Sequence, residues 1–329
     1  MIKKLLSSLF IVAILVSCGG SQKQSGTPTP GGKESKESIE IAVIPKSFSH
    51  QFWLTVKAGA EDAGKELGVK IIWQGTAKET EVEQQINIVQ DMINRKVKAI
   101  VLAASDANAL VGIVENAINK GIPVVTIDSG VNSDKPISFV ATDNILGAKI
   151  AADTLAKLIG EEGEVGLIPF VSGAATSEMR ERGFKEGISA YPKIKLVSVQ
   201  YSDSNVAKAM DVTNDMLTAF PNLKGIFAAN ESSAVGCAQA VKSKGKAGQV
   251  KIVAFDAAEE EIQALKEGVI QALIVQNPYK MGYLGVKTAY DAIQGKPVEK
   301  RIDTGVTVVT MENINDPEIQ KVLYPTSSK

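Results

Sequence analysis

Two aspartates stand at corresponding places in the chain, each directly after a run of apolar residues. Asp128 ends the stretch IPVVTID, and Asp256 ends the stretch VKIVAFD. A strand that is buried on both faces is apolar throughout, so both runs are typical of strands inside a parallel sheet. One such aspartate alone is better explained as the cap of a loop or helix. Because ligands bind outside the carboxyl ends of strands in open α/β sheets, the paired occurrence predicts two acidic side chains on either side of one cleft.

The chemistry of these strand ends suits a polyhydroxylated ligand. Carboxylates accept hydrogen bonds from hydroxyl groups, while guanidinium and amide groups donate them. Phe52 and Trp53, just after the first expected strand, could cover the apolar face of a sugar ring. They could equally be core residues at the start of a helix. Neighbouring helix residues point about 100° apart, so we expect at most one of the two to face the core fully.

Motifs for catalysis or cofactor binding are missing from the sequence. It contains no GxxxxGK[ST] loop, no GxGxxG after the first strand, no GxSxG elbow and no HExxH or CxxC pair. His50 is the one histidine, so every histidine-dependent scheme would rest on it. The sequence therefore predicts a binding protein, with no enzymatic activity, no cofactor and no metal site.

The elements that would position these residues alternate between strand and helix. We expect strands at residues 39–44, 69–73, 99–103, 123–127, 138–141, 164–168, 195–200, 225–229, 250–255 and 272–275. We expect helices at residues 51–67, 80–94, 107–120, 145–159, 178–190, 206–220, 233–244, 259–266 and 279–294. This alternation predicts parallel sheets wrapped by helices on both faces. The strands are too many for one sheet of this type, so we expect two Rossmann-like lobes.

An internal similarity supports the division into two halves. The stretch KAIVLAASDANALVG (residues 98–112) resembles KGIFAANESSAVG (residues 224–236). Each is an apolar strand followed by a polar pair and a helix, and in each half the next strand ends in one of the two aspartates.

The first 38 residues are expected to lie outside the fold. Lys3 and Lys4 precede a short apolar stretch that ends in LVSC, which resembles the lipobox of bacterial lipoproteins. We expect a signal peptide at residues 1–17, a lipid on Cys18 and a flexible Gly/Ser/Pro-rich tether over residues 18–38. An ordinary secretory signal is the alternative. The protein would then be held at a membrane surface in an extracytoplasmic space.

Charge and cysteine content add two exclusions. The formal net charge is −1, so no basic face favours nucleic acid. Removal of the two signal-peptide lysines leaves −1 − 2 = −3. With only Cys18 and Cys237 in the chain, we expect no disulfide.

Several segments, in order, resemble a known family. GIPVVTIDSG, SFVATDNILGAKIAAD, RERGF, IFAANE, VAFDA and ALIVQNPYKMGYLGVKTA are together similar to the type I periplasmic sugar-binding proteins of ABC transporters, of the ribose-binding kind. The resemblance runs from about Ile39 to about Val309. It implies two lobes that close on a sugar, and a membrane permease that receives the loaded protein, which we expect to be a monomer.

The resemblance also implies which residues bind the ligand. In this family, polar residues from both lobes hold the sugar and aromatic residues stack on its ring. Arg180 matches the second lobe's arginine better than Arg182 does. Gln276 matches a glutamine of the hinge. The matching positions are Phe52, Trp53, Asp128, Arg180, Asn230, Asp256 and Gln276.

Four pocket positions depart from the ribose-binding pattern. Ser129 replaces an arginine, Ala103 and His50 replace asparagines, and Ser204 replaces an aromatic residue. The resemblance therefore does not identify ribose as the ligand. We expect Lys46, His50 and Ser129 to contact the ligand as well. A loop position without a ligand contact is the alternative for His50.

Three crossings between the lobes are implied by the same resemblance. They fall near residues 142–143, 276–277 and 303–304, which gives an N-terminal lobe of residues 39–142 with 277–303. The C-terminal lobe is residues 143–276 with 304–329. An alternative function is a chemotaxis or quorum-signal receptor for a furanose-type molecule on the same fold. A lactose-repressor-type regulator is disfavoured because a tether stands where such proteins carry a helix-turn-helix.

Overall fold

The structure, a computed structural model, describes residues 38–325. The expected signal peptide, the lipid-bearing Cys18 and nearly all of the expected tether lie outside the described residues, as do residues 326–329. Over residues 38–325, no helix is long and apolar enough to cross a membrane. The strands of this part of the chain form two separate six-stranded sheets.

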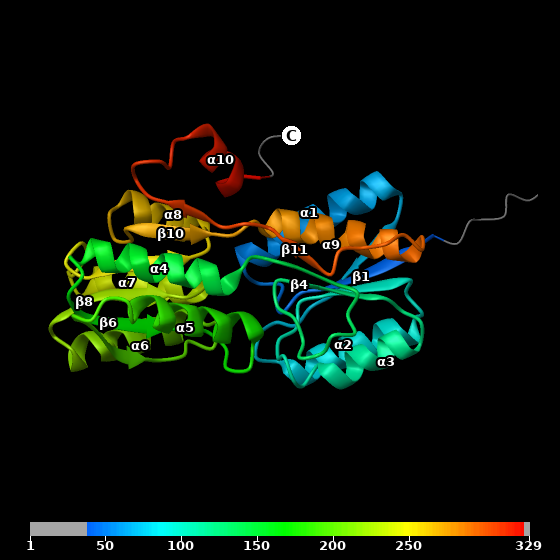
Figure 1. Ribbon diagram of the computed structural model, residues 1–329, viewed down its shortest axis with the longest axis horizontal. Coiled ribbons are helices and arrows are strands. Elements are labelled where there is room, and N and C mark those ends of the chain that lie inside the picture. The colour runs from blue at the N-terminus through cyan, green and yellow to red at the C-terminus, as the bar shows by residue number, and fades with distance from the viewer. Residues whose placement is uncertain (1–37, 326–329) are drawn as a thin grey trace, which may run out of the picture. The chain divides into compact units, whose positions relative to one another are not determined.

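The first sheet has the strand order β11-β5-β4-β3-β1-β2, and every neighbouring pair is parallel. Helices α1 and α9 cover one face, and α2 and α3 cover the other (Figure 1). Ile41 packs with the first helix pair and Ala42 with the second, because successive residues of β1 point to opposite faces. We call this unit the N-lobe. Its elements are β1 (Glu40–Ile44), α1 (Gln51–Leu67), β2 (Lys70–Trp73), α2 (Val82–Asn94), β3 (Ala99–Leu102), α3 (Val111–Asn119), β4 (Val124–Ile127), β5 (Ser138–Ala141), α9 (Pro278–Ile293) and β11 (Arg301–Asp303).

The second sheet has the order β12-β10-β9-β8-β6-β7, in which only the edge strand β12 is antiparallel to its neighbour. Helices α4 and α5 pack on one face, and α6, α7 and α8 on the other. The short α10 joins the α8 side through Leu323. We call this unit the C-lobe. Its elements are α4 (Asn144–Leu158), β6 (Gly163–Ile168), α5 (Ala175–Ile188), β7 (Ile194–Val199), α6 (Val206–Ala219), β8 (Leu223–Ala228), α7 (Glu231–Ser243), β9 (Lys251–Phe255), α8 (Glu259–Lys266), β10 (Ala272–Val275), β12 (Thr307–Val309) and α10 (Pro317–Leu323).

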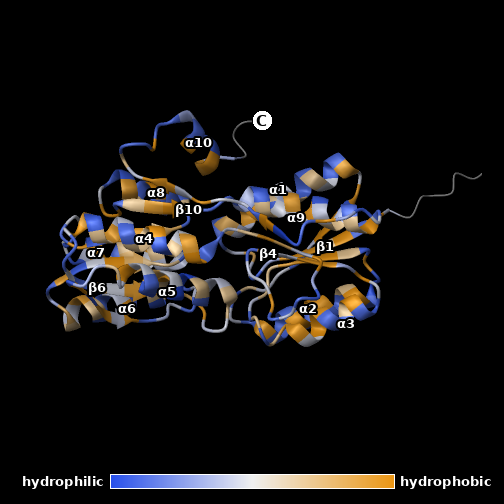
Figure 2. Cartoon of the chain, viewed as in Figure 1, coloured by the Kyte–Doolittle hydropathy of each residue, from blue (hydrophilic) through white to orange (hydrophobic). Residues whose placement is uncertain are grey.

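The two sheets repeat one topology. The first five strands of each lobe have the order 2-1-3-4-5 when they are numbered along that lobe, so the predicted pair of Rossmann-like lobes is confirmed. The strands carry most of the apolar residues, whereas the helices alternate between apolar and polar sides (Figure 2). This topology brings the carboxyl ends of β3, β4, β8 and β9 to the edges where ligands bind in such sheets.

The structure adds elements that the sequence did not predict and shifts others by a few residues. Strands β11 and β12 have three residues each, too few to show a hydrophobic period, and α10 was also missed. The helix expected at residues 107–120 begins only at Val111. The Asp106 carboxylate accepts hydrogen bonds from the backbone N–H groups of Asn108 and Ala109, which hold these residues in a turn.

The chain passes between the lobes three times within the described residues: from β5 to α4, from β10 to α9 and from β11 to β12. Two of these crossings bond to each other. The Thr142 hydroxyl lies 3.3 Å from that of Thr304 and donates to the carbonyl of Gly305 at 3.1 Å. The β5–α4 and β11–β12 crossings therefore lie side by side.

Candidate functional site

The two aspartates lie at the carboxyl ends of β4 and β9, directly after each strand. Both have left-handed backbone conformations, with φ of 54° at Asp128 and 83° at Asp256. Aspartate adopts this conformation more readily than most residues. Both are nearly buried, at 3% and 7% exposure. Each side chain therefore leaves its sheet at a sharp backbone turn.

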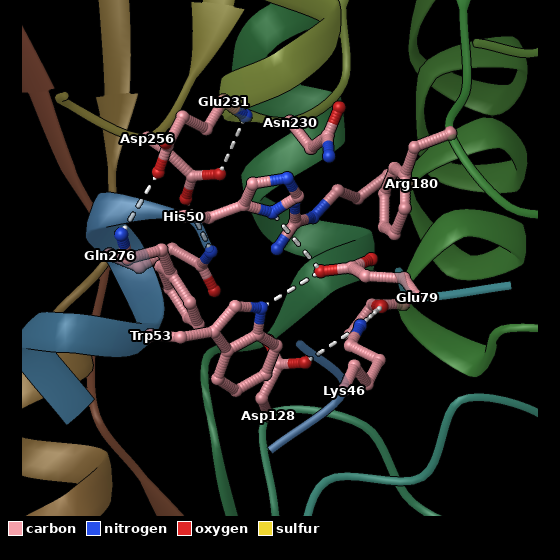
Figure 3. A pocket seen from close by; sticks show the side chains of 13 residues that line it. Lys46, His50, Trp53, Glu79, Asp128, Arg180, Asn230, Glu231, Asp256 and Gln276 are labelled. Carbon is pink, nitrogen blue, oxygen red and sulfur yellow. Dashed lines mark hydrogen bonds and ion pairs between the residues drawn. The ribbon is translucent and has the colours of Figure 1, made fainter. Parts of the chain in front are cut away.

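A cavity lies between the two sets of strand ends. It includes nine of the ten residues predicted to bind a ligand; Ser129 is not part of the wall. Ser129 is fully buried, and its carbonyl accepts a hydrogen bond from Ala104 N. Figure 3 shows charged side chains from both lobes turned toward one another. The lining residues are Lys46, His50, Phe52, Trp53, Glu79, Asp128, Phe170, Thr176, Arg180, Asn230, Glu231, Asp256 and Gln276.

A buried ion pair forms part of the N-lobe wall. Lys46 Nζ lies 2.9 Å from Asp128 Oδ2, and both side chains are 3% exposed. The same Nζ donates to Thr176 Oγ1 of the C-lobe at 3.1 Å. It also lies 5.6 Å from the Trp53 ring centroid and 5.3 Å from that of Phe170. Lys46 thus links the first-lobe carboxylate to the opposite lobe.

Glu79 lies at the centre of a second polar group in the N-lobe (Figure 3). Its Oε1 accepts a hydrogen bond from Trp53 Nε1 at 2.9 Å and lies 3.5 Å from His50 Nδ1. Burial opposes ionisation, but the Lys46 charge and the contacts with His50 and Trp53 outweigh it and lower the pKa of Glu79 to about 2. The carboxylate also raises the pKa of His50 against the effect of burial. Glu79 Oε2 is buried and has no hydrogen-bond partner in the protein.

The predicted aromatic pair is divided between core and cavity. Phe52 and Trp53 both line the cavity, in edge-to-face contact with ring centroids 4.9 Å apart. Trp53 is 1% exposed and belongs to the core beneath α1, whereas Phe52 is only partly buried. The expectation that no more than one of them faces the core fully agrees with this geometry.

Arg180 forms the centre of the C-lobe wall. It is 2% exposed, its Nε donates to Asn144 Oδ1 at 2.8 Å, and one terminal nitrogen donates to the Ala229 carbonyl at 2.7 Å. Its guanidinium lies 3.8 Å from the Phe255 ring centroid. Burial lowers its pKa against the opposing charge of Asp256. Arg182 has an exposed side chain and is not part of the cavity.

Asp256 is anchored at both oxygens. Oδ1 accepts from Gln276 Nε2 at 2.7 Å, and Oδ2 accepts from the backbone N–H of Glu231 at 3.0 Å. Burial raises the pKa of Asp256, although the Arg180 charge opposes this. Asn230 caps α7 by accepting from Ser233 N at 3.0 Å. These contacts hold the second-lobe polar residues in fixed orientations before any ligand is considered.

Four cavity residues were missed by the sequence analysis: Glu79, Phe170, Thr176 and Glu231. Phe170 comes two residues after β6, so the strand-end pattern that identified Asp128 could have found it. The family resemblance matched the second-lobe aromatic residue to position 204, which is a serine here. The Ser204 hydroxyl instead accepts a hydrogen bond from Asn230 Nδ2 at 2.8 Å. Glu79 lies in a loop and had no comparable signal.

This arrangement can recognise hydroxyl groups and apolar ring faces. Carboxylate and amide acceptors, charged donors and aromatic faces converge on one small space. Over residues 38–325, no group of three or more His, Cys, Asp or Glu side chains is placed to hold a metal ion.

Comparison with known proteins identifies the class. A family model described as the periplasmic binding protein domain matches residues 41–297. The chain belongs to this family, and the resemblance inferred from the sequence is confirmed. Since the members are binding components of transport systems, the prediction that the chain is not an enzyme is also confirmed. Within the family, the chain groups with the sugar-binding proteins of ABC transporters.

Three relatives illustrate the similarity. A D-ribose/D-allose-binding protein of Pseudomonas aeruginosa is 34% identical over 292 residues, covering 86% of this chain and 91% of the relative. A solute-binding protein of Agrobacterium vitis, solved with D-fucose, is 42% identical with a TM-score of 0.85, covering 87% of this chain and 100% of that chain. One from Agrobacterium radiobacter, solved with D-arabinose, is 37% identical with a TM-score of 0.85, covering 88% and 100%.

Proposed function

We propose that this chain is the solute-binding component of an ABC importer and that it holds one monosaccharide between its lobes. The main support is the cavity wall, in which buried carboxylates and cations from both lobes stand beside Phe52, Trp53 and Phe170. The relatives named above carry D-fucose and D-arabinose or are named for D-ribose and D-allose.

Two unpartnered acceptors indicate where sugar hydroxyls would bind. Glu79 Oε2 and Gln276 Oε1 are both buried, both belong to cavity residues, and neither receives a hydrogen bond from the protein. A buried acceptor that stays unsatisfied costs about 1–3 kcal/mol. A ligand hydroxyl at each would remove this cost, and a deoxy analogue would not. Glu79 is therefore added to the ten residues predicted from the sequence.

Binding would couple to lobe closure. We place the hinge at the three crossings and the lobe boundaries at residues 142/143, 276/277 and 303/304. A ligand that touches both lobes favours the closed form, since only there are all its contacts made. The closed form would be the one that docks on the permease.

A thermal-shift screen tests this function. We expect at least one of D-ribose, D-allose, D-arabinose, D-fucose and D-tagatose to raise the melting temperature, because binding at 100 times Kd stabilises the native state by about 2.7 kcal/mol. Sucrose and free amino acids serve as controls. If none of the monosaccharides stabilises the protein while a ligand of another class does, the proposed function is wrong.

We also infer that the protein is a lipoprotein, anchored in an extracytoplasmic space through Cys18. The support is the LVSC stretch after a short apolar segment, followed by a Gly/Ser/Pro-rich tether. Cys18→Ser should move the protein from the membrane fraction to the soluble extracytoplasmic fraction. A Cys237→Ser variant is the control for loss of a thiol. Equal membrane partition of Cys18→Ser and the unaltered protein would exclude lipidation at this position.

A further inference from the structure

The N-terminus of α1 lacks a cap from its own lobe. Its N-cap residue, His50, makes no side-chain capping bond, and the first turn contains no acidic residue. The Glu231 carboxylate of the C-lobe takes this place. Its two oxygens accept from the backbone N–H groups of Gln51 at 3.1 Å and Phe52 at 2.9 Å. A carboxylate at a helix N-terminus satisfies free N–H groups and interacts favourably with the helix dipole.

The N-lobe in turn caps a helix of the C-lobe. Gln51 Oε1 accepts from the backbone N–H of Glu259 at 2.9 Å, at the first residue of α8 in the C-lobe. Ala258, the N-cap residue of α8, has no side chain that could do so. A third contact joins His50 Nε2 and Ser232 Oγ at 3.1 Å. Each lobe thus caps a helix of the other.

We propose that Glu231 and Gln51 are positioning residues that form a closure latch. The latch holds the two lobes together and lowers the apparent Kd for every sugar by the same factor. The inference rests on the proposed function in one respect, namely that the closed form is the one that binds. When only the closed form binds, the apparent Kd equals the intrinsic Kd divided by the closed fraction. Opening the lobes removes both exchanged caps at once and returns three backbone N–H groups and two side-chain groups to water.

Gln51 gives the cleaner test of the two residues. Glu231 lines the sugar cavity, so its substitution could change a ligand contact as well as closure. Gln51 is exposed and does not line the sugar cavity, although it lines a second cavity beside it. Among the hydrogen bonds described, its side chain bonds only to the opposite lobe. Gln239, an exposed glutamine on α7 of the C-lobe, provides a matched control.

The experiment measures Kd and the dissociation rate for three sugars with the unaltered protein, Gln51→Ala, Glu231→Gln and Gln239→Ala. We expect Gln51→Ala to raise every Kd by the same factor of about 2 to 12, the effect of one neutral hydrogen bond, mainly through faster dissociation. Gln239→Ala should change nothing. Unchanged Kd values in Gln51→Ala, or a factor that differs from sugar to sugar, would overturn the latch.

A second measurement separates the latch from the proposed function. Small-angle scattering without sugar should give a larger radius of gyration for Glu231→Ala and Gln51→Ala than for the unaltered protein and Gln239→Ala. Equal radii would refute the latch. A failure of all sugars to bind the unaltered protein would instead refute the proposed function, and the scattering comparison would still test the latch.

Discussion

Substitution of Asp256 by Asn isolates the charge of the second-lobe carboxylate. With φ of 83°, this position suits Asp and Asn better than Ala, which strains in the left-handed region. Asn also keeps the size of the side chain. The Gln276 amide can reverse, so that its unpartnered Oε1 accepts a hydrogen bond from the new amide. The backbone conformation and packing should therefore survive while the charge is lost.

The magnitude follows from the contacts of Asp256. A hydrogen bond to a charged group contributes about 1.5–3 kcal/mol, and each 1.4 kcal/mol is tenfold in Kd. We expect Asp256→Asn to raise Kd roughly 10- to 140-fold. The free energy of unfolding should change by less than about 1 kcal/mol, because the lost attraction to Arg180 is offset by no longer burying a charge. Asp256→Ala should lose about 1–2 kcal/mol more through backbone strain.

Isothermal titration with the sugar that gives the largest thermal shift provides the assay. Asp203 is the matched control, because it also has a left-handed conformation, with φ of 53°, but its side chain is exposed and pairs with Lys208. Asp203→Asn should bind as the unaltered protein does. If Asp256→Asn also keeps its original Kd, Asp256 is not a ligand-binding residue and the assignment of the second-lobe site fails.

Three further predictions concern stability. The ionised state of Glu79 contributes stability that is present above its ordinary pKa near 4.5 and is lost as pH falls toward its folded pKa of about 2, a difference worth about 3 kcal/mol. In urea unfolding, the free energy of unfolding of Glu79→Gln should therefore fall less between pH 5 and 3 than that of the unaltered protein, and parallel pH profiles would contradict this. Trp53→Phe removes the indole donor to this carboxylate and should lower the free energy of unfolding by about 2 kcal/mol; an unchanged denaturation midpoint would exclude that contribution. Gly59→Ala places a Cβ 2.0 Å from the Tyr279 carbonyl and should destabilise the protein by about 1–3 kcal/mol or more. The control, Gly112→Ala in α3, places a Cβ that meets nothing within 4 Å and should stabilise the protein by up to about 1 kcal/mol. Equal melting temperatures for the two variants would refute this view of the contact between α1 and α9.

The fold was largely predictable because its strands are buried on both faces. Runs such as residues 99–102 and 252–255 are apolar throughout, and glycines with positive φ, such as Gly68, follow the helices between them. The strand order could not be read this way, since periodicity does not say which strands are neighbours. The short β11 and β12 gave no pattern at all, and only the family resemblance indicated a crossing there.

The site was predictable where it follows a strand end and unpredictable elsewhere. Asp128 and Asp256 come directly after apolar runs. Arg180 and Arg182 are two residues apart on one helix, about 200° around its axis, so the sequence indicates that they face opposite ways without saying which is buried. Glu79 becomes a site residue only through contacts with Trp53 and His50, which depend on tertiary packing.

The position of α9 in the chain also determines the order in which the protein can fold during synthesis. This helix covers one face of the N-lobe sheet together with α1, with Val286 and Ala289 packed against the core that contains Trp53. All of β6 to β10 are synthesised before it. Because domains fold as their segments emerge, the C-lobe has its five parallel strands while the N-lobe still exposes apolar surface to water. The N-lobe begins first along the polypeptide, yet its sheet is covered only after the five parallel strands of the C-lobe have been made. A chain that stops before Pro278 would therefore expose this core.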